Sequence, residues 1–308
     1  MLPLRLIRRR IKSVENTKKM TRAMEMVAAS KLKKLQDLLK QSDRYIGELK
    51  RILGTLVREK PLTHPLLENR LLEKEGRKAK ESATLVFVIT SDTGLCGSYN
   101  TNLMERVSEF LKTESKGRQF HFIAIGRNGA SYLKRNRLAV NEALAVPKPQ
   151  EIESTIEHVT RIAVEEFKNG KVDEVFFIYT KVHSLASLKP EAARLFPITH
   201  EANRGQVLDN KKEPVPYLNL EVDYILDPNL DEILELMLPE FIQAEIGQFI
   251  KNSLVAEQAS RMTAMHQATE NAKEMIESLT LMRNKARQAS ITKELLEVVS
   301  GSRALQMK

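Results

Sequence analysis

Residues 241–308 have the pattern of one uninterrupted helix, which is too long to fit inside a compact core. No proline follows Pro239, and Gly247 and Gly301 are the only glycines in this segment. At 1.5 Å per residue such a helix would run roughly 100 Å, several times the usual globular length. Its apolar residues step by three and four, the heptad seam of a coiled coil. We expect this seam at Met265, Ala268, Ala272, Met275, Leu279, Met282, Ala286 and Ala289.

The N-terminal segment can supply the helix that covers this seam. Between Pro3 and Pro61 there is no proline, so residues 4–60 can be helical. Met20 and Met24 lead by steps of four into Ala28 and Leu32, which predicts a stutter between two apolar registers. The first register is Leu4, Ile7, Ile11 and Val14; the second is Ala28, Leu32, Leu35, Leu39, Ile46, Leu49, Leu53 and Leu56, with Ser42 as its one polar member.

The residues between the two helices can bring the chain back, so the simplest pairing is antiparallel, with both termini at one end. An ordinary helical bundle is the alternative. Neither segment has a second apolar face broad enough for a bundle.

The middle of the chain alternates strand and helix patterns. Residues 61–80 are polar and broken by Pro65 and Gly76, as in a linker. The alternation after them predicts a small, Rossmann-like α/β domain with a mainly parallel sheet. Its expected strands are 83–90, 120–125, 174–179, 194–198 and an edge strand at 217–226; its expected helices are 100–112, 130–135 and 151–168. The predicted fold is therefore α+α/β: N-terminal coiled-coil helix 1–60, linker 61–82, α/β domain 83–226 and C-terminal helix 227–308, launched by Asp227 and Pro228.

Charge restricts the kind of partner. The net charge of the 308 residues is +9, but residues 1–60 hold 17 Lys and Arg against 6 Asp and Glu, a net of +11. This excess suits an acidic surface on a protein or a nucleic acid. The longest apolar run, residues 85–89, is too short to cross a bilayer, and residues 1–10 lack an export signal. A single cysteine, Cys96, excludes an internal disulfide and a cysteine zinc cluster.

The loop at residues 91–98 is the one enzyme-like signal. It follows a strand and precedes a helix, where α/β folds bind phosphates. It matches no standard phosphate-binding motif and has no lysine, so a tight turn is the favoured interpretation over a nucleotide-using enzyme. Cys96 has no histidine nearby in sequence and is expected to be a buried small residue. The six histidines are scattered without a metal-ligand spacing, so we expect neither a metal nor a cofactor.

Two further patterns point to partner binding. The basic residues of the first helix have only one aromatic neighbour, Tyr45, so base stacking is not available; a basic coiled-coil scaffold for nucleic acid stays as the alternative function. Beyond Ala289 the seam stops at Lys293, yet apolar residues continue on more than one face and need enclosure. Packing on Leu4, Leu6 and Ile7 of the same chain is the other possibility. The residues concerned are Ile291, Leu295, Leu296, Val298, Val299, Ala304 and Leu305.

Four segments of the sequence carry motifs of one known family. The N-terminal segment runs from Arg10 to Lys31 and includes TRAMEMVAASK, and the central motif is SDTGLCGSYN at residues 91–100. The C-terminal segments are RMTAM at 261–265 and NKARQASITKELLEVVSG at 284–301. In this order, the four segments resemble the gamma subunit of F-type ATP synthases of the bacterial kind. Two positions depart from the family pattern: Thr93 stands where arginine is usual, and Arg303 where the tail is usually small and apolar.

The resemblance implies a noncatalytic rotor shaft, one copy per complex, without a cofactor, metal or nucleotide of its own. Its partners would be a ring of three alpha and three beta subunits, the epsilon subunit and the membrane c-ring. Rotation driven by the ion gradient would couple to ATP synthesis, and ATP hydrolysis would drive the reverse. The chain would be peripheral, at the cytoplasmic face of the bacterial inner membrane.

The resemblance also implies contact residues. Met24 and Arg261 would face an acidic beta-subunit loop, with a basic surround that includes Arg8, Arg9 and Lys12. Nearer the C-terminus, the residues expected to touch beta-subunit loops or the sleeve of the ring are Arg287, Gln288, Thr292, Glu294, Leu295 and Val299.

Overall fold

The computed structural model describes residues 4–59, 66, 82–114, 118–198 and 230–306. The described chain falls into two compact units. The first, called here the paired-helix unit, comprises residues 1–30 and 260–308; the second, the domain unit, comprises residues 31–259. The expected linker at 61–82 and edge strand at 217–226 lie almost entirely outside the described residues, so the four-part division stays a prediction.

Two long helices dominate the structure. Helix α1 spans Leu4–Glu59 and helix α7 spans Leu230–Gln306, and each contributes to both units. Helix α7 begins before Phe241 and runs through Pro239, although proline removes one backbone hydrogen bond from a helix interior. The prediction of one long N-terminal helix and one long C-terminal helix is confirmed.

In the paired-helix unit, the covered positions of α1 form one unbroken heptad series, so the predicted stutter is wrong. Met20 is 60% exposed and Met24 is also exposed. Polar residues occupy the seam where the stutter was expected, because polar side chains of α7 form hydrogen bonds with them. The positions of this series are Leu4, Ile7, Ile11, Val14, Lys18, Thr21, Glu25 and Ala28, and Ala29 next to it is also half-buried.

The partner residues on α7 show an antiparallel pairing in this unit. The Thr269 hydroxyl lies 2.8 Å from that of Thr21, and His266 Nδ1 lies 3.0 Å from Glu25 Oε1. Met265 and Ala272 are buried as predicted. The predicted seam is wrong at Met275 and Met282, which are exposed, while Ile276 and Arg283 are half-buried in their place.

Within the domain unit, α1 and α7 are again antiparallel, and polar pairs link them. Lys50 Nζ lies 2.9 Å from Glu245 Oε2, Lys251 Nζ donates to Ser42 Oγ at 2.9 Å, and the Gln248 amide donates to Asp43. As residue numbers rise along α1 from 42 to 50, those of their α7 partners fall from 251 to 245. The long antiparallel helix pair predicted from the sequence is therefore confirmed.

The domain unit also contains a five-stranded sheet in the order β3-β2-β1-β4-β5. Strands β1 to β4 are mutually parallel, and β5 runs antiparallel to β4. Strand β5 is longer than expected. Strand β3 was not predicted, because its sequence VNEAL is short and contains Asn and Glu among its five residues. The elements are β1 (Ala83–Ile89), α3 (Tyr99–Glu114), β2 (Gln119–Ile125), α4 (Arg127–Arg135), β3 (Val140–Leu144), η2 (Pro149–Glu151), α5 (Ile152–Lys168), β4 (Glu174–Ser184) and β5 (Ser187–Phe196).

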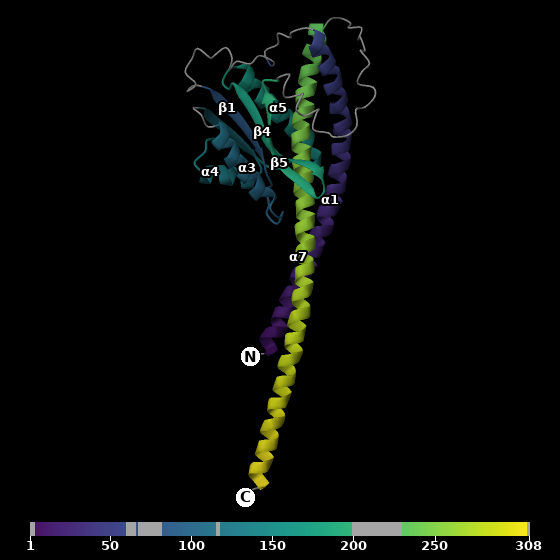
Figure 1. Cartoon of the computed structure of the whole chain (residues 1–308), viewed down its shortest axis with the longest axis vertical. Helices are drawn as coiled ribbons and strands as arrows, with labels where there is room; N and C mark the ends of the chain where they lie inside the picture. The colour runs from purple at the N-terminus through teal and green to yellow at the C-terminus, as the bar shows by residue number, and fades with distance from the viewer. Residues whose placement is uncertain (1–3, 60–65, 67–81, 115–117, 199–229, 307–308) are drawn as a thin grey trace. The chain divides into compact units, whose positions relative to one another are not determined.

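Helices cover both faces of this sheet (Figure 1). Helices α3 and α4 bury one face through a cluster that includes Val86, Leu103 and Phe122. Helices α5 and α7 lie on the other, where the ring of Phe249 packs 5.1 Å from that of Phe177 and 4.7 Å from that of Tyr179. Residues 252–259 of α7 are buried on every side. This part of α7 is thus a core helix of the α/β domain as well as a partner of α1.

Candidate functional site: the exposed tip of helix α7

The last turns of α7 are helical and uncovered. Every residue from 291 to 300 is exposed, and the large apolar side chains among them are 49% to 70% exposed. The alternative, packing of the tip on Leu4, Leu6 and Ile7 of the same chain, is not seen at residues 291–300, because all of them are exposed. The exposed apolar residues are Ile291, Leu295, Leu296, Val298 and Val299.

The helix pairing explains why the tip is bare. Because Thr21 faces Thr269, an antiparallel pair with equal rise places Leu4 opposite about residue 286. The N-terminal end of helix α1 therefore lies level with the last seam residues of α7. Figure 1 shows α7, in yellow, continuing past the N-terminal end of α1, in purple. An apolar helix surface of this kind marks an interaction site.

Polar side chains at the base of the tip contact other groups of the same helix. The Thr292 hydroxyl donates to the Gln288 carbonyl at 3.0 Å, and the Ser290 hydroxyl donates to Glu294 at 3.2 Å. Arg287 and Gln288 are exposed. These four predicted contact residues, Arg287, Gln288, Thr292 and Glu294, lie within about two turns of one helix, so the structure brings them together with Leu295 and Val299.

The other predicted contact residues lie further along the paired-helix unit. Met24 is exposed and Arg261 is half-buried; with the register above, they lie within about two helical turns of each other along the pair. Arg8, Arg9 and Lys12 are exposed nearer the N-terminus of α1. The predicted residues thus form three groups at successive levels and not one site.

An exposed stripe on α1 was missed. Met20, Met24 and Val27, at i, i+4 and i+7, share one exposed face of the helix. Sequence reasoning assigned the two methionines to the seam because they are apolar. The spacing Val14, Lys18, Thr21, which continues the heptad without a break, is the signal that could have found the stripe.

The loop between β1 and α3 holds the sheet together and contacts α7. The Asp92 carboxylate accepts the backbone N–H of Arg127 at 3.0 Å and of Val146 at 3.2 Å, which joins three connections at the carboxyl edge of the sheet. Cys96 and Tyr99 are buried against Ala256 of α7. The Asp92 carboxylate is thus used in joining neighbouring connections of the same domain, which favours the structural interpretation of this loop.

Burial also changes the chemistry of Tyr99. Its hydroxyl donates to the Ile89 carbonyl at 3.3 Å. Desolvation, reinforced by the negative charge of Glu257, raises the pKa of Tyr99 well above 10. The side chain is therefore a neutral part of the core at any physiological pH.

The described residues lack the features of a metal site and of a membrane-spanning helix. Among them, no three His, Cys, Asp or Glu side chains form a group suited to a metal ion. None of the described helices has the length and apolarity needed to cross a membrane.

Comparison with known proteins gives one consistent result. The family model described as ATP synthase matches residues 3–305. The ATP synthase gamma chain of Solibacter usitatus is 38% identical over 97% of this chain and 98% of its own length, and that of Desulfitobacterium hafniense is 33% identical over 99% and 100%.

Among solved structures, the fold is similar to one titled as the rotor of the Euglena gracilis mitochondrial ATP synthase, with a TM-score of 0.62 at 16% identity, covering 94% of this chain and 98% of that one. These findings do not support the nucleic-acid alternative. The two gamma chains align with 97% and 99% of this chain, so the alignments include the sequence of both long helices and of the α/β domain between them. The chain therefore belongs to the ATP synthase gamma chain family.

Proposed function

We propose that the chain is the central rotor shaft of an F-type ATP synthase. It couples ion-driven rotation of a membrane c-ring to conformational change at catalytic beta subunits, and it works in reverse when ATP hydrolysis drives ion pumping. The observation that carries the proposal is the apolar tip of α7, which stands free of α1 on a helix that is otherwise paired. A sleeve formed by a ring of other subunits is the kind of enclosure that would bury it on all sides.

The three groups of contact residues then have distinct tasks. Leu295 and Val299 enter the apolar sleeve of a ring of three alpha and three beta subunits. Arg287, Gln288, Thr292 and Glu294 meet beta-subunit loops at the mouth of that sleeve. Met24 and Arg261 face an acidic beta-subunit loop, and Arg8, Arg9 and Lys12 add attraction to acidic groups.

The remaining assignments follow from the same role. The chain is itself noncatalytic, is present in one copy per complex, and also meets an epsilon subunit. It is a peripheral protein at the cytoplasmic face of the inner membrane. The absence of a catalytic role is supported by the loop at residues 91–98, whose polar groups are used in holding the sheet.

Reconstitution tests the proposal. Alpha, beta and epsilon subunits are combined with a c-ring-containing membrane sector in vesicles, with and without this chain, and ATP synthesis is measured under an imposed ion gradient. We expect gradient-driven synthesis only with the chain, and a ratio of one chain to three alpha and three beta subunits. Coupled synthesis that survives without the chain would contradict the proposal.

A further inference from the structure

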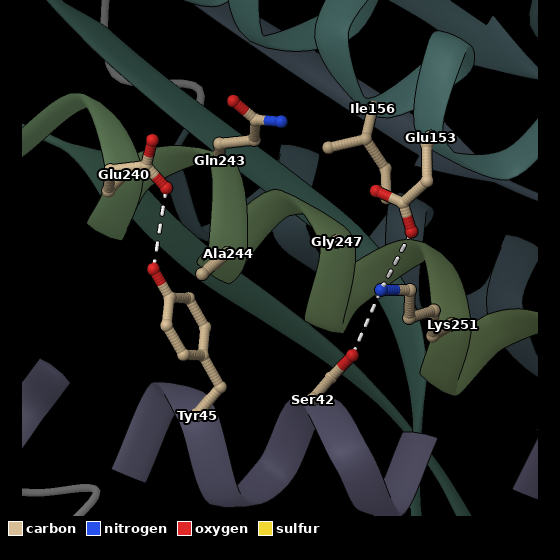
Figure 2. A pocket seen from close by; sticks show the side chains of 9 residues that line it. All are labelled: Ser42, Tyr45, Glu153, Ile156, Glu240, Gln243, Ala244, Gly247 and Lys251. Atoms are coloured by element: carbon tan, nitrogen blue, oxygen red, sulfur yellow. Dashed lines mark hydrogen bonds and ion pairs between the residues drawn. The ribbon is translucent and has the colours of Figure 1, made fainter. Parts of the chain in front are cut away.

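A crevice in the domain unit separates three helices at the place where they converge. Its volume is about 270 Å³, and its walls come from α1, α5 and α7. Figure 2 shows Ser42 and Tyr45 rising from α1, Glu153 and Ile156 reaching down from α5, and Lys251 projecting from α7 between them. Side chains that reach across the crevice from one helix to another therefore fix the separation of the helices.

Lys251 is the side chain that reaches both neighbouring helices. Its ammonium donates to Ser42 Oγ on α1 at 2.9 Å and lies 3.3 Å from Glu153 Oε1 on α5. The lysine side chain is only 13% exposed, whereas that of Glu153 is 69% exposed. An ammonium that is mostly withdrawn from water must keep its partners, so its position constrains theirs.

The second contact between α5 and α7 is apolar. A Cβ on Gly247 would lie 3.2 Å from the Cδ1 atom of Ile156, so the absence of a side chain at Gly247 lets α5 approach the backbone of α7. Lys251 lies one helical turn beyond Gly247 on the same face. Two contacts at adjacent turns prevent α5 from rotating about either contact. A single contact would allow that rotation.

We propose that Lys251 is a positioning residue that locks α5 of the α/β domain to the α1–α7 pair of the domain unit, so that a torque applied to the domain turns both helices with it. The proposal rests on the rotor function proposed above. Its mechanical part, the locking of α5, is a property of the chain alone and can be tested apart from rotation.

The role is geometric more than stabilising. An ion pair with one exposed partner contributes little to stability, and replacing a mostly buried charge by an apolar side chain of similar length is often tolerated. Lys251→Met should therefore leave the thermal midpoint of the chain nearly unchanged while loosening α5. A purely structural role predicts the opposite combination, a lowered midpoint with no loosening.

Spin labels measure the locking. One pair of labels is placed at Glu157 on α5 and Leu236 on α7, and a reference pair at Lys40 on α1 and Leu236; all three positions are exposed, and Cys96 is buried. In Lys251→Met, we expect the distance distribution of the first pair to widen roughly twofold, because one of the α5–α7 contacts described above is lost. The reference pair should keep its width, and Lys251→Arg should restore the narrow distribution of the first.

Lys171→Met is the matched control. Lys171 pairs with Glu166 at 2.7 Å near the end of α5 but reaches no other helix through that pair. It should leave both distributions unchanged. An unchanged width for the Glu157–Leu236 pair in Lys251→Met would overturn the locking.

A second arm tests transmission in the reconstituted enzyme by measuring ions pumped per ATP hydrolysed. We expect a loss in Lys251→Met and none in Lys171→Met. A widened distribution with undiminished pumping would overturn the transmission of torque while leaving the locking. If the wild-type chain restores no coupled pumping, the rotor function itself fails, and this result is distinct from both others.

Discussion

At the scale of single residues, aromatic packing and burial anchor α7 to the sheet. Phe249 lies against Phe177 and Tyr179, and the side chains alternate along β4, so that Phe176 and Ile178 serve the opposite face. Asn252 and Ser253 complete the junction by accepting the backbone N–H groups of Val182 and Thr180, at 3.2 and 3.3 Å. Helix α7 is thus held to the sheet both by apolar packing and by hydrogen bonds.

Phe249→Ala should be strongly destabilising. It removes a buried ring from between α7 and the sheet and leaves a cavity, at a cost of about 3–5 kcal/mol in the free energy of unfolding. Urea unfolding of the full chain, followed by circular dichroism, measures the change. Leu236→Ala, at an exposed position on the same helix, should change it by less than about 0.5 kcal/mol. Equal effects of the two substitutions would contradict the packing described.

Tyr99 makes the chain less stable at high pH. Its pKa is raised in the folded state by burial, so the folded chain keeps the phenolic proton above pH 10 while the unfolded chain loses it. The stability is fully present below the unfolded pKa and declines above it, by about 1.4 kcal/mol from this residue between pH 8 and pH 11. Urea titrations of wild type and Tyr99→Phe at the two pH values should differ in their losses by this amount. Equal losses in the two proteins would contradict this effect of burial.

At the scale of elements, α7 changes environment along its length. Near Phe249 it is a core helix under a sheet, near Thr269 it is one half of a coiled coil, and at residues 291–300 all its side chains are exposed in the part of the chain that the structure describes. The helix can keep one conformation because its backbone hydrogen bonds are internal and do not depend on what its side chains touch.

Leu295→Gln with Val299→Gln should separate folding from assembly. Both side chains are exposed, so the free energy of unfolding of the isolated chain should change by less than about 0.5 kcal/mol. If a sleeve buries them, affinity for the alpha–beta ring should fall at least roughly 100-fold, since burying each side chain contributes about 1.5–3 kcal/mol. Binding to the ring is measured by surface-immobilised titration, with Leu236→Gln as the exposed apolar control. Undiminished affinity would count against enclosure of the tip.

At the scale of the whole molecule, the positive charge is unevenly distributed along the chain. Residues 1–60 carry a net charge of +11, whereas the whole chain carries +9, so the other residues together are slightly acidic. Much of the basic excess is presented on the exposed side of α1, including Arg8, Arg9 and Lys12. Such an arrangement attracts and orients an acidic partner before contact.

Replacing Arg8, Arg9 and Lys12 together by glutamine should slow association with the ring more than it speeds dissociation. We expect an association rate about tenfold lower at low salt and a weaker dependence on salt concentration, because exposed charges act through long-range attraction. Stopped-flow mixing at several ionic strengths measures both. A control with Lys112, Lys134 and Lys168 replaced keeps the same net charge change on the α/β domain. Equal slowing in the control would show that only net charge matters.

The sequence by itself determined the long helices, their antiparallel pairing and most of the parallel sheet. These follow from local rules: proline-free segments, three-four spacing and apolar runs between turns. It also located the bare tip, because Lys293 interrupts the seam while apolar residues continue. Strand β3 escaped because its five residues carry little apolar signal.

Only the tertiary structure decided which face of each helix is covered. Apolar character suggested Met20, Met24, Met275 and Met282 for the seam, but the position opposite Thr21 is taken by Thr269, and the polar pair fixes the register. The burial of residues 252–259 on every side, and the span of Lys251 across three helices, likewise depend on elements far apart in sequence. A heptad pattern specifies that a helix has a partner; the side chains that the partner brings decide which residues meet it.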